Sequence, residues 1–239
     1  TLSSSSAASD VYKRQVHTEY SMLDGAARVG DLMSEVKAQG MPAIAMTDHG
    51  NVFGAFDFYK AAKNADIKPI IGIEAYVAPE SRFDKKRVQW ADGGEDDVSG
   101  GGAYTHMTIL AENNQGLANL FRLSSLASLE GYYYKPRMDR ELLATYSQGL
   151  IATTGCPGGE IQTRLRMGAY KEAIKAASAY RDIFGKENFY LEVMDHGIEI
   201  EARVKADLLK LGKELGLPLL ATNDLHYTRQ TDAPAHEAL

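Results

Sequence analysis

The stretch AIAMTDHGNVFG, residues 43–54, decides the fold. It begins with an apolar run, Ala43–Met46, and then breaks off into a polar turn that carries Asp48 and His49. A short and fully apolar run is typical of a strand that is buried on both faces of a parallel sheet. In α/β barrels, the functional side chains follow the carboxyl ends of such strands. The stretch therefore predicts an α/β fold that presents a carboxylate and an imidazole at one strand end.

Three further apolar runs end in side chains that can bind metals: 70–73 before Glu74, Leu150–Thr153 before Cys156, and Leu219–Ala221 before Asp224 and His226. Strands are also predicted at Thr105–Ala111 and Phe189–Val193. Helical spacing of apolar residues predicts helices at about 29–40, 51–66, 114–124, 169–184 and 201–215. In the second of these helices, we expect Val52, Phe53, Phe56 and Tyr59 on the buried side. The alternation of strands and helices favours a parallel sheet with right-handed crossovers, closed into a barrel.

The composition limits the classes of protein to which the chain can belong. Its 239 residues suit one α/β domain, and the 44% apolar and 24% charged shares are ordinary for a soluble globular protein. No apolar run approaches the roughly 18 residues that span a bilayer. A single cysteine excludes an internal disulfide framework and fits a reducing cytoplasm. The net charge of −6 argues against a surface that binds nucleic acid mainly by neutralising phosphates.

The two ends of the chain bear on the expected domain organisation. Residues 1–15, TLSSSSAASDVYKRQ, are rich in serine and alanine and have no apolar period, so they are expected to be a non-native or disordered leader. The remaining residues, 16–239, are expected to form one domain. At Leu239 the chain stops within a helix-like stretch that has no cap, which indicates a fragment of a longer chain.

The candidate site combines imidazole, carboxylate and thiol groups. The candidate ligands are His17, Asp24, His49, Glu74, His106, Cys156, Asp224 and His226. This mixture suits zinc, manganese or iron better than calcium or magnesium. Because one tetrahedral ion needs fewer ligands, we expect two or three ions bridged by carboxylate. Such clusters hydrolyse phosphoesters by activating a water molecule and holding the phosphate oxygens.

Each candidate also has an ordinary structural interpretation. His106 alone could be a hydrogen-bonding residue at a strand end, and Cys156 a small buried hydrophobe. Asp48 and Asp224 could cap the helices that follow them. Only their repeated placement at strand ends favours a common site.

Six blocks of the sequence, taken in order, resemble the PHP (polymerase and histidinol phosphatase) domain. They are HTEYSMLDG, AMTDHGNVFGA, KPIIGIEAYV, THMTILA, GLIATTGCPGGEI and ATNDLHY. Two more, AYVAPESRFDKK and GYYYKPRMDRELL, are similar to the version of this domain at the N-terminus of the bacterial DNA polymerase III alpha subunit. The resemblance implies a distorted (βα)7 barrel, similar to a TIM barrel, with a trinuclear metal site in its mouth. It also implies that the eight candidate ligands occupy the family's metal positions.

One position departs from the family pattern, which opens with His-x-His. Here Gln15 replaces the first histidine, at the junction with the unusual leader. The neutral amide oxygen of glutamine is a poor ligand for transition metals. The departure leaves two interpretations, a leader that has overwritten a histidine or a weakened metal site.

The resemblance implies a role in DNA replication. The chain would be part of a DNA-directed DNA polymerase, a nucleotidyltransferase that uses magnesium in another domain. The domain itself would be a metal-dependent 3′–5′ exonuclease, or a structural platform that docks a separate proofreading subunit. His49 and Asp224 are the expected catalytic residues, and Arg137 either contacts phosphate or is a purely structural arginine.

The implied partners are DNA, the proofreading subunit and the sliding clamp, in the cytoplasm and without a membrane. Two alternatives stay open. One is a free-standing PHP phosphoesterase of the histidinol-phosphatase type, acting on a small phosphorylated metabolite. The other is a non-enzymatic module whose metals only hold loops together.

Overall fold

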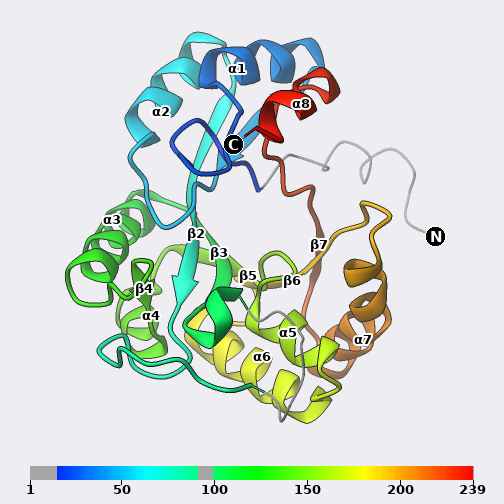
Figure 1. Ribbon diagram of the computed structural model, residues 1–239. Coiled ribbons are helices and arrows are strands. Elements are labelled where there is room, and N and C mark those ends of the chain that lie inside the picture. Colours follow the sequence, from blue (N-terminus) through cyan, green and yellow to red (C-terminus); the bar gives the residue numbers. More distant parts are fainter. Residues whose placement is uncertain (1–14, 91–98, 239) are drawn as a thin grey trace.

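A computed structural model describes residues 15–90 and 99–238. The predicted leader, apart from Gln15, lies outside these residues. Seven strands in the described part form one sheet in the order β1-β2-β3-β5-β6-β7, and β4 pairs with β2. The strands are β1 (Ala43–Met46), β2 (Lys68–Val77), β3 (Thr105–Ala111), β4 (Arg137–Met138), β5 (Leu150–Thr153), β6 (Phe189–Val193) and β7 (Leu219–Ala221). Figure 1 shows that this sheet curls around the centre of the molecule, as predicted for a barrel-like fold.

Most helices lie on the outer side of the curled sheet (Figure 1). They are α1 (Val29–Ala38), α2 (Ala55–Asn64), α3 (Asn114–Leu129), α4 (Arg140–Tyr146), α5 (Glu160–Arg166), α6 (Tyr170–Phe184), α7 (Glu199–Leu215) and α8 (Ala233–His236), with short 3₁₀ turns at Ser99–Gly102 and Gln230–Asp232. The apolar residues at helical spacing are buried in α1 (Val29, Leu32, Met33 and Val36) and, in α7, at Val204, Leu208 and Leu211. Among the described residues, no helix is both long and apolar enough to cross a membrane.

The prediction of an all-parallel sheet is wrong at β3. This strand runs antiparallel to β2 and to β5, whereas β1, β2, β5, β6 and β7 follow the parallel pattern. A parallel neighbour requires a crossover, usually a helix packed on the sheet. In its described part, the connection between β2 and β3 has only the 3₁₀ turn Ser99–Gly102 and no crossover helix. The chain therefore turns back, and β3 pairs with β2 in the opposite direction.

The N-terminal segment completes the ring between the two ends of the strand order, β1 and β7. The Thr47 amide, just after β1, donates to the Val16 carbonyl at 2.9 Å, and the His17 amide donates to the Leu225 carbonyl at 2.8 Å. Val16 and Leu225 form an isolated parallel bridge. As a result, His17 is fixed between the residues that follow β1 and those that follow β7.

The buried side of α2 differs from the prediction. The helix begins at Ala55 rather than near Asn51, and its buried residues are Ala55, Phe58 and Ala62. Three aromatic side chains predicted on the buried side lie outside instead. The exposed fractions are 79% for Phe53, 69% for Phe56 and 49% for Tyr59.

Candidate metal centre

The turn after β1 is held by a buried carboxylate. Asp48 accepts hydrogen bonds from the Thr18 amide at 2.6 Å, from the Thr18 hydroxyl at 2.9 Å and from the Ser21 hydroxyl at 3.0 Å. Asp48 therefore ties the loop that begins at His17 to the end of β1 and does not cap α2. Burial raises the pKa of Asp48, although these hydrogen bonds partly oppose the rise. The sequence did not single out this supporting role.

Glycine at position 50 lets the turn fold back tightly beside His49. Its φ of +65° is unfavourable for other residues, and a Cβ atom there would lie 2.7 Å from the Tyr76 ring. The Gly50 amide donates to the Glu74 carbonyl at 2.9 Å. The His49 amide donates to the Ser21 hydroxyl at 3.1 Å. Together these bonds fix the backbone that carries the His49 imidazole.

Glu74, in β2, is at the centre of the cluster and is fully buried. Its two oxygens lie close to four other side chains: Gln15 Nε2 at 2.7 Å, His17 Nε2 at 2.9 Å, His106 Nδ1 at 2.5 Å and Cys156 Sγ at 3.3 Å. Burial raises the pKa of Glu74, but the positive charge and hydrogen bond of His106, aided by His17, hold it well below its usual range. Glu74 is therefore ionised.

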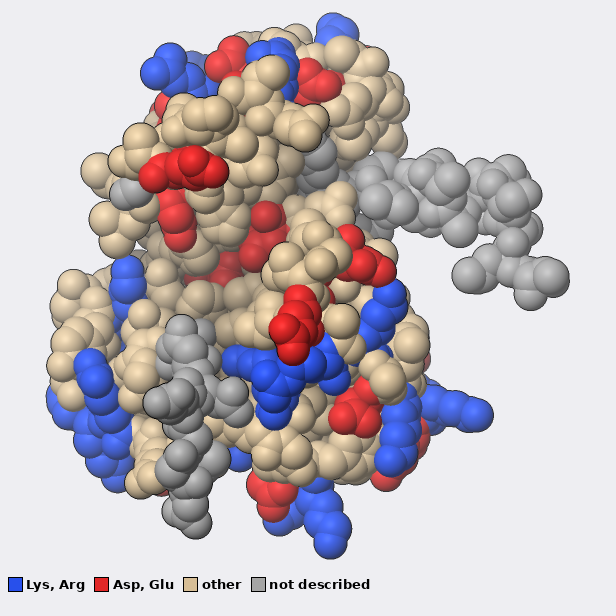
Figure 2. Space-filling view, turned by 45° about the vertical axis from the view of Figure 1, so that its right-hand side comes forward, with Lys and Arg blue, Asp and Glu red and all other residues tan. Residues whose placement is uncertain are grey.

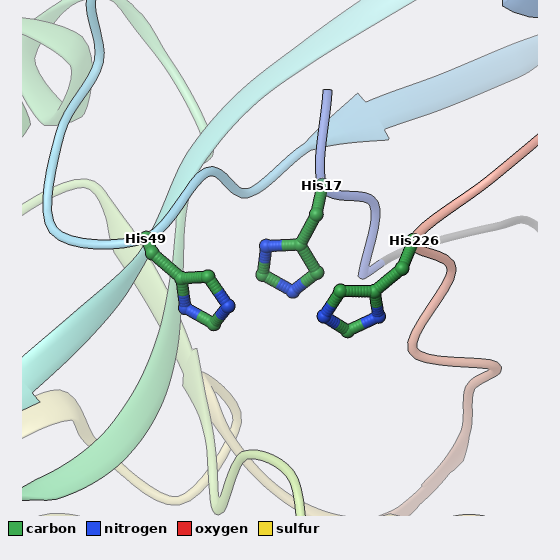
Figure 3. Close-up of side chains that lie close together, drawn as sticks. All are labelled: His17, His49 and His226. Atoms are coloured by element: carbon green, nitrogen blue, oxygen red, sulfur yellow. The ribbon is translucent and has the colours of Figure 1, made fainter. Parts of the chain in front are cut away.

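The other half of the cluster links the loops after β1 and β7. His17 Nε2 lies 3.1 Å from Asp224 Oδ1, and His49 Nε2 lies 2.9 Å from Asp24 Oδ2. The His17 ring stacks between two others, with centroids 4.0 Å from His49 and 4.3 Å from His226. Figure 3 shows these three imidazoles side by side, although they come from three separate segments. The structure thus brings all eight predicted ligands together.

Burial and the charges of neighbouring side chains shift the pKa values of the histidines and the cysteine in the cluster. Burial lowers the pKa of His17, but hydrogen bonds and charges from Asp224 and Glu74 outweigh this and raise it to about 10. Burial and then the charge of His17 lower the pKa of His226. Burial, with the nearby Glu74 carboxylate, raises the pKa of Cys156 well above its ordinary value. Metal binding would replace these protons, since metals bind the deprotonated side chains.

The donor set fits divalent metal ions. Three polar atoms of the cluster are buried without a hydrogen-bond partner among the described residues: Gln15 Oε1, Asp24 Oδ1 and His49 Nδ1. An unpaired buried polar atom costs about 1–3 kcal/mol unless a ligand satisfies it. Three groups have ligand atoms within 4.8 Å of one another: His17, His49 and His226; His49, Glu74 and His106; His17, Glu74 and Asp224. Each group could hold an ion, and shared members would link the ions.

Arg137 requires a correction, because it does not face this site. It is fully buried, and its guanidinium donates to four backbone carbonyls: Gly131 at 3.0 Å, Ala103 at 3.0 Å, Arg82 at 3.2 Å and Asp84 at 2.9 Å. A guanidinium used in this way has no free edge for phosphate. The prediction that Arg137 contacts phosphate is therefore wrong, and the structural alternative holds.

Another buried carboxylate, Glu192, lies near the cluster and was not predicted from the sequence. Glu192 in β6 accepts hydrogen bonds from the hydroxyls of Thr153 and Thr222. Burial raises its pKa to about 7, despite these two bonds. The signal in the sequence is a single glutamate within the otherwise apolar and aromatic strand FYLEV.

The family model described as "PHP domain" matches residues 14–196 of the chain. The DNA polymerase III subunit alpha of Saccharopolyspora erythraea is 62% identical over 94% of this chain, and that of Mycobacterium tuberculosis is 56% identical over the whole chain. The corresponding subunit of Thermus aquaticus is 47% identical over 93% of the chain. The chain spans about a fifth of the length of these relatives.

Solved structures share the fold at low sequence identity. An amidohydrolase from Chromobacterium violaceum, with bound sulfate and no metal, has a TM-score of 0.55 at 13% identity, over 91% of this chain and 88% of that one. A candidate metal-dependent phosphoesterase from Bifidobacterium adolescentis has a TM-score of 0.52 at 14% identity, with the same coverage. These similarities bear on the barrel-like architecture alone.

Proposed function

The chain belongs to the PHP domain family, and on that premise we propose that residues 16–239 are the PHP domain of a bacterial DNA polymerase III alpha subunit. The identity of 56–62% to such subunits, over nearly the whole chain, supports this proposal. Because the chain spans about a fifth of their length, DNA synthesis and its magnesium ions would belong to parts of such a subunit outside this chain. The partners of the whole subunit would be DNA, the sliding clamp and a proofreading subunit.

The domain itself would hydrolyse phosphodiester bonds at a DNA 3′ end. The observation that carries this proposal is the convergence of four different side chains on the oxygens of the buried Glu74. His17, Asp24, His49, Glu74, His106, Cys156, Asp224 and His226 would hold two or three ions of zinc, manganese or iron. When bound, such ions supply Lewis acidity toward phosphate and lower the pKa of water.

The exposed and buried side chains of the cluster determine the side from which a substrate would reach the metal centre. Asp24 and His49 line an open cleft, whereas His17 and Glu74 are fully buried behind them. A scissile phosphate would therefore reach the centre from the side of His49. Asp224 accepts a hydrogen bond from His17 and so would fix that imidazole in place. For this reason His49 and Asp224 are the residues whose loss should affect hydrolysis most directly.

The test is release of nucleotides from a 3′-labelled single-stranded oligonucleotide in the presence of manganese. The double variant His49→Ala, Asp224→Ala should lose this activity, and a chelator should abolish it in the unmodified chain. Asp195→Ala, His196→Ala is a matched control, because it removes another neighbouring carboxylate and imidazole, which contact Lys205 and Glu201 instead. Equal release by the first variant and the unmodified chain would overturn the catalytic proposal.

Gln15 favours a second candidate function. If glutamine in place of histidine weakens the site, the domain would act as a structural platform that docks a separate proofreading subunit. A free-standing phosphoesterase of the histidinol-phosphatase type is the remaining alternative. Hydrolysis of histidinol phosphate without release from DNA would support that alternative, and neither activity with intact folding would support the platform.

A further inference from the structure

An open cleft lies directly beside the metal centre. Its volume is about 480 Å³, within the range that holds small ligands, and His49 and Asp24 line it. The remaining wall comes from residues 20–23, from the turn from Gly50 to Phe53, from the loop at Tyr132–Pro136 that follows α3, and from Tyr76 in β2 and Ser128 in α3. Figure 2 shows a hollowed face of the molecule with acidic side chains at depth and mostly uncharged residues around them.

Large aromatic side chains in the cleft wall are exposed. The exposed fraction is 79% for Phe53 and 61% for Tyr132, and the ring of Tyr76 also contributes to the wall. Met22 and Leu23 add further exposed apolar surface. Contiguous exposed apolar surface often marks a site that binds a ligand or a partner. Flat rings that solvent can reach provide stacking surfaces for planar ligands.

Lys135 supplies the only Lys or Arg side chain among the residues that line the cleft. Its Nζ atom lies 5.6 Å from the centroid of the Tyr76 ring, and among the described residues no carboxylate forms an ion pair with it. A single cation beside aromatic walls matches one phosphate joined to an aromatic base.

Two polar side chains in the wall, those of Asn51 and Ser128, already form hydrogen bonds within the protein. The amide group of Asn51 donates to the Tyr20 and His49 carbonyls at 3.3 and 3.0 Å, and its oxygen accepts from the Phe53 amide at 3.0 Å. The hydroxyl of Ser128 donates to the Ser124 carbonyl at 3.1 Å. Neither side chain has a free hydrogen-bond donor for the edge of a base. Stacking therefore remains the main means of recognition, and stacking tolerates any base.

We propose that this cleft binds one unpaired nucleotide next to the phosphodiester bond that is cut, with Lys135 on a phosphate and Tyr132 and Phe53 against the base. This inference rests on the proposed function, since it names the substrate subsite of the same centre. Bases in a duplex are stacked and paired, so the cleft selects frayed or single-stranded ends. Recognition is independent of the base sequence.

The test compares Tyr132→Leu and Lys135→Met with the unmodified chain. Binding of a 5′-fluorescein-labelled dT8 oligonucleotide is measured by fluorescence anisotropy in a chelator, so that no turnover occurs. Each variant should bind about tenfold more weakly. With manganese present, the ratio of kcat/KM for dT8 to kcat/KM for bis-p-nitrophenyl phosphate should fall by a similar factor.

Matched controls lie away from the cleft. Lys210→Met removes a lysine over the Tyr170 ring, with Nζ 4.4 Å from its centroid, and Phe121→Leu removes a partly exposed ring on α3. Both should behave as the unmodified chain does. Affinity for dT8 and a kcat/KM ratio that are unchanged in Tyr132→Leu and Lys135→Met would overturn the inference. If the unmodified chain hydrolyses neither substrate, the proposed function fails, and weaker dT8 binding by the two cleft variants would still support the cleft.

Discussion

At the scale of single residues, Gln15 is the position where this chain departs from the His-x-His pattern. Its side chain is buried, donates to Glu74 at 2.7 Å through Nε2, and leaves Oε1 without a partner among the described residues. It therefore occupies the site without offering a strong ligand.

Gln15→His should tighten metal binding, because imidazole is a much better ligand for zinc and manganese than a neutral amide. The expected result is a zinc affinity about tenfold or more higher. Changes to the groups around a metal ion typically alter its affinity by a factor of this size. Competition with a chromogenic chelator measures it. An unchanged affinity, with Gln15→Ala also unchanged, would show that this position takes no part in binding.

Glu192 makes folding stability depend on pH. Its pKa rises from 4.5 in the unfolded chain to about 7 in the folded protein, so its contribution is fully present below pH 4.5 and is lost as the pH rises through 7. The difference corresponds to about 3 kcal/mol. Glu192→Gln should remove this dependence, since an amide stays neutral and can still bond to the two threonines.

Urea unfolding in a chelator at pH 5 and pH 8 tests the prediction. The unmodified chain should lose more free energy of unfolding between these values than Glu192→Gln does. Equal changes in the free energy of unfolding of the two proteins would contradict the claim that burial raises the pKa of Glu192.

The sequence was enough to predict which types of side chain form the candidate site, but not which of them are in contact. Polar residues after apolar runs indicated Glu74 and His49 because the carboxyl ends of barrel strands meet at one face. His17 and Asp224 are 207 positions apart, and nothing local to either residue predicts their 3.1 Å contact. The same limit explains Arg137, whose carbonyl partners lie in the connection between β2 and β3 and in the loop after α3.

At the scale of elements, Arg137 connects the loops around β2 and β4. Arg137→Met would leave four backbone carbonyls without their donor, three of them buried and one partly buried. The free energy of unfolding should therefore fall by about 3 kcal/mol or more.

Arg122→Met serves as the control for this change. Arg122 is exposed on α3 and lies 5.9 Å from the Tyr146 ring centroid, so its loss should change stability by less than about 0.5 kcal/mol. The denaturant midpoints of the two variants provide the comparison. Similar midpoints would show that the carbonyl contacts of Arg137 contribute little.

Strands were easier to predict than the orientation of their neighbours. The bounds of β1, β3, β5, β6 and β7 agree with the predictions, because each is a short run rich in apolar and β-branched residues between breaks. The direction of β3 depends on the long connection before it, which has no periodicity to read. The buried side of α2 depends on where the helix begins, and its exposed aromatics resemble core residues in sequence alone.

At the scale of the whole molecule, the metal centre and the closure of the ring depend on the same segment. Residues 15–18 bridge the ends of β1 and β7 and also carry His17. The closed ring brings together ligands from segments spread between positions 17 and 226. The net charge of the whole chain, −6, gives no indication of this site. A site of this kind is an outcome of the fold, which explains why it could be predicted as a face of the barrel but not as a set of distances.

The most direct test of this account is the number of metal ions per chain, measured by native mass spectrometry after loading with zinc or manganese. Gln15→His should carry two or three ions, and Glu74→Ala in the same background should lose them, because Glu74 contacts four other side chains of the cluster. Well under one ion per folded chain in Gln15→His would contradict the existence of the metal cluster.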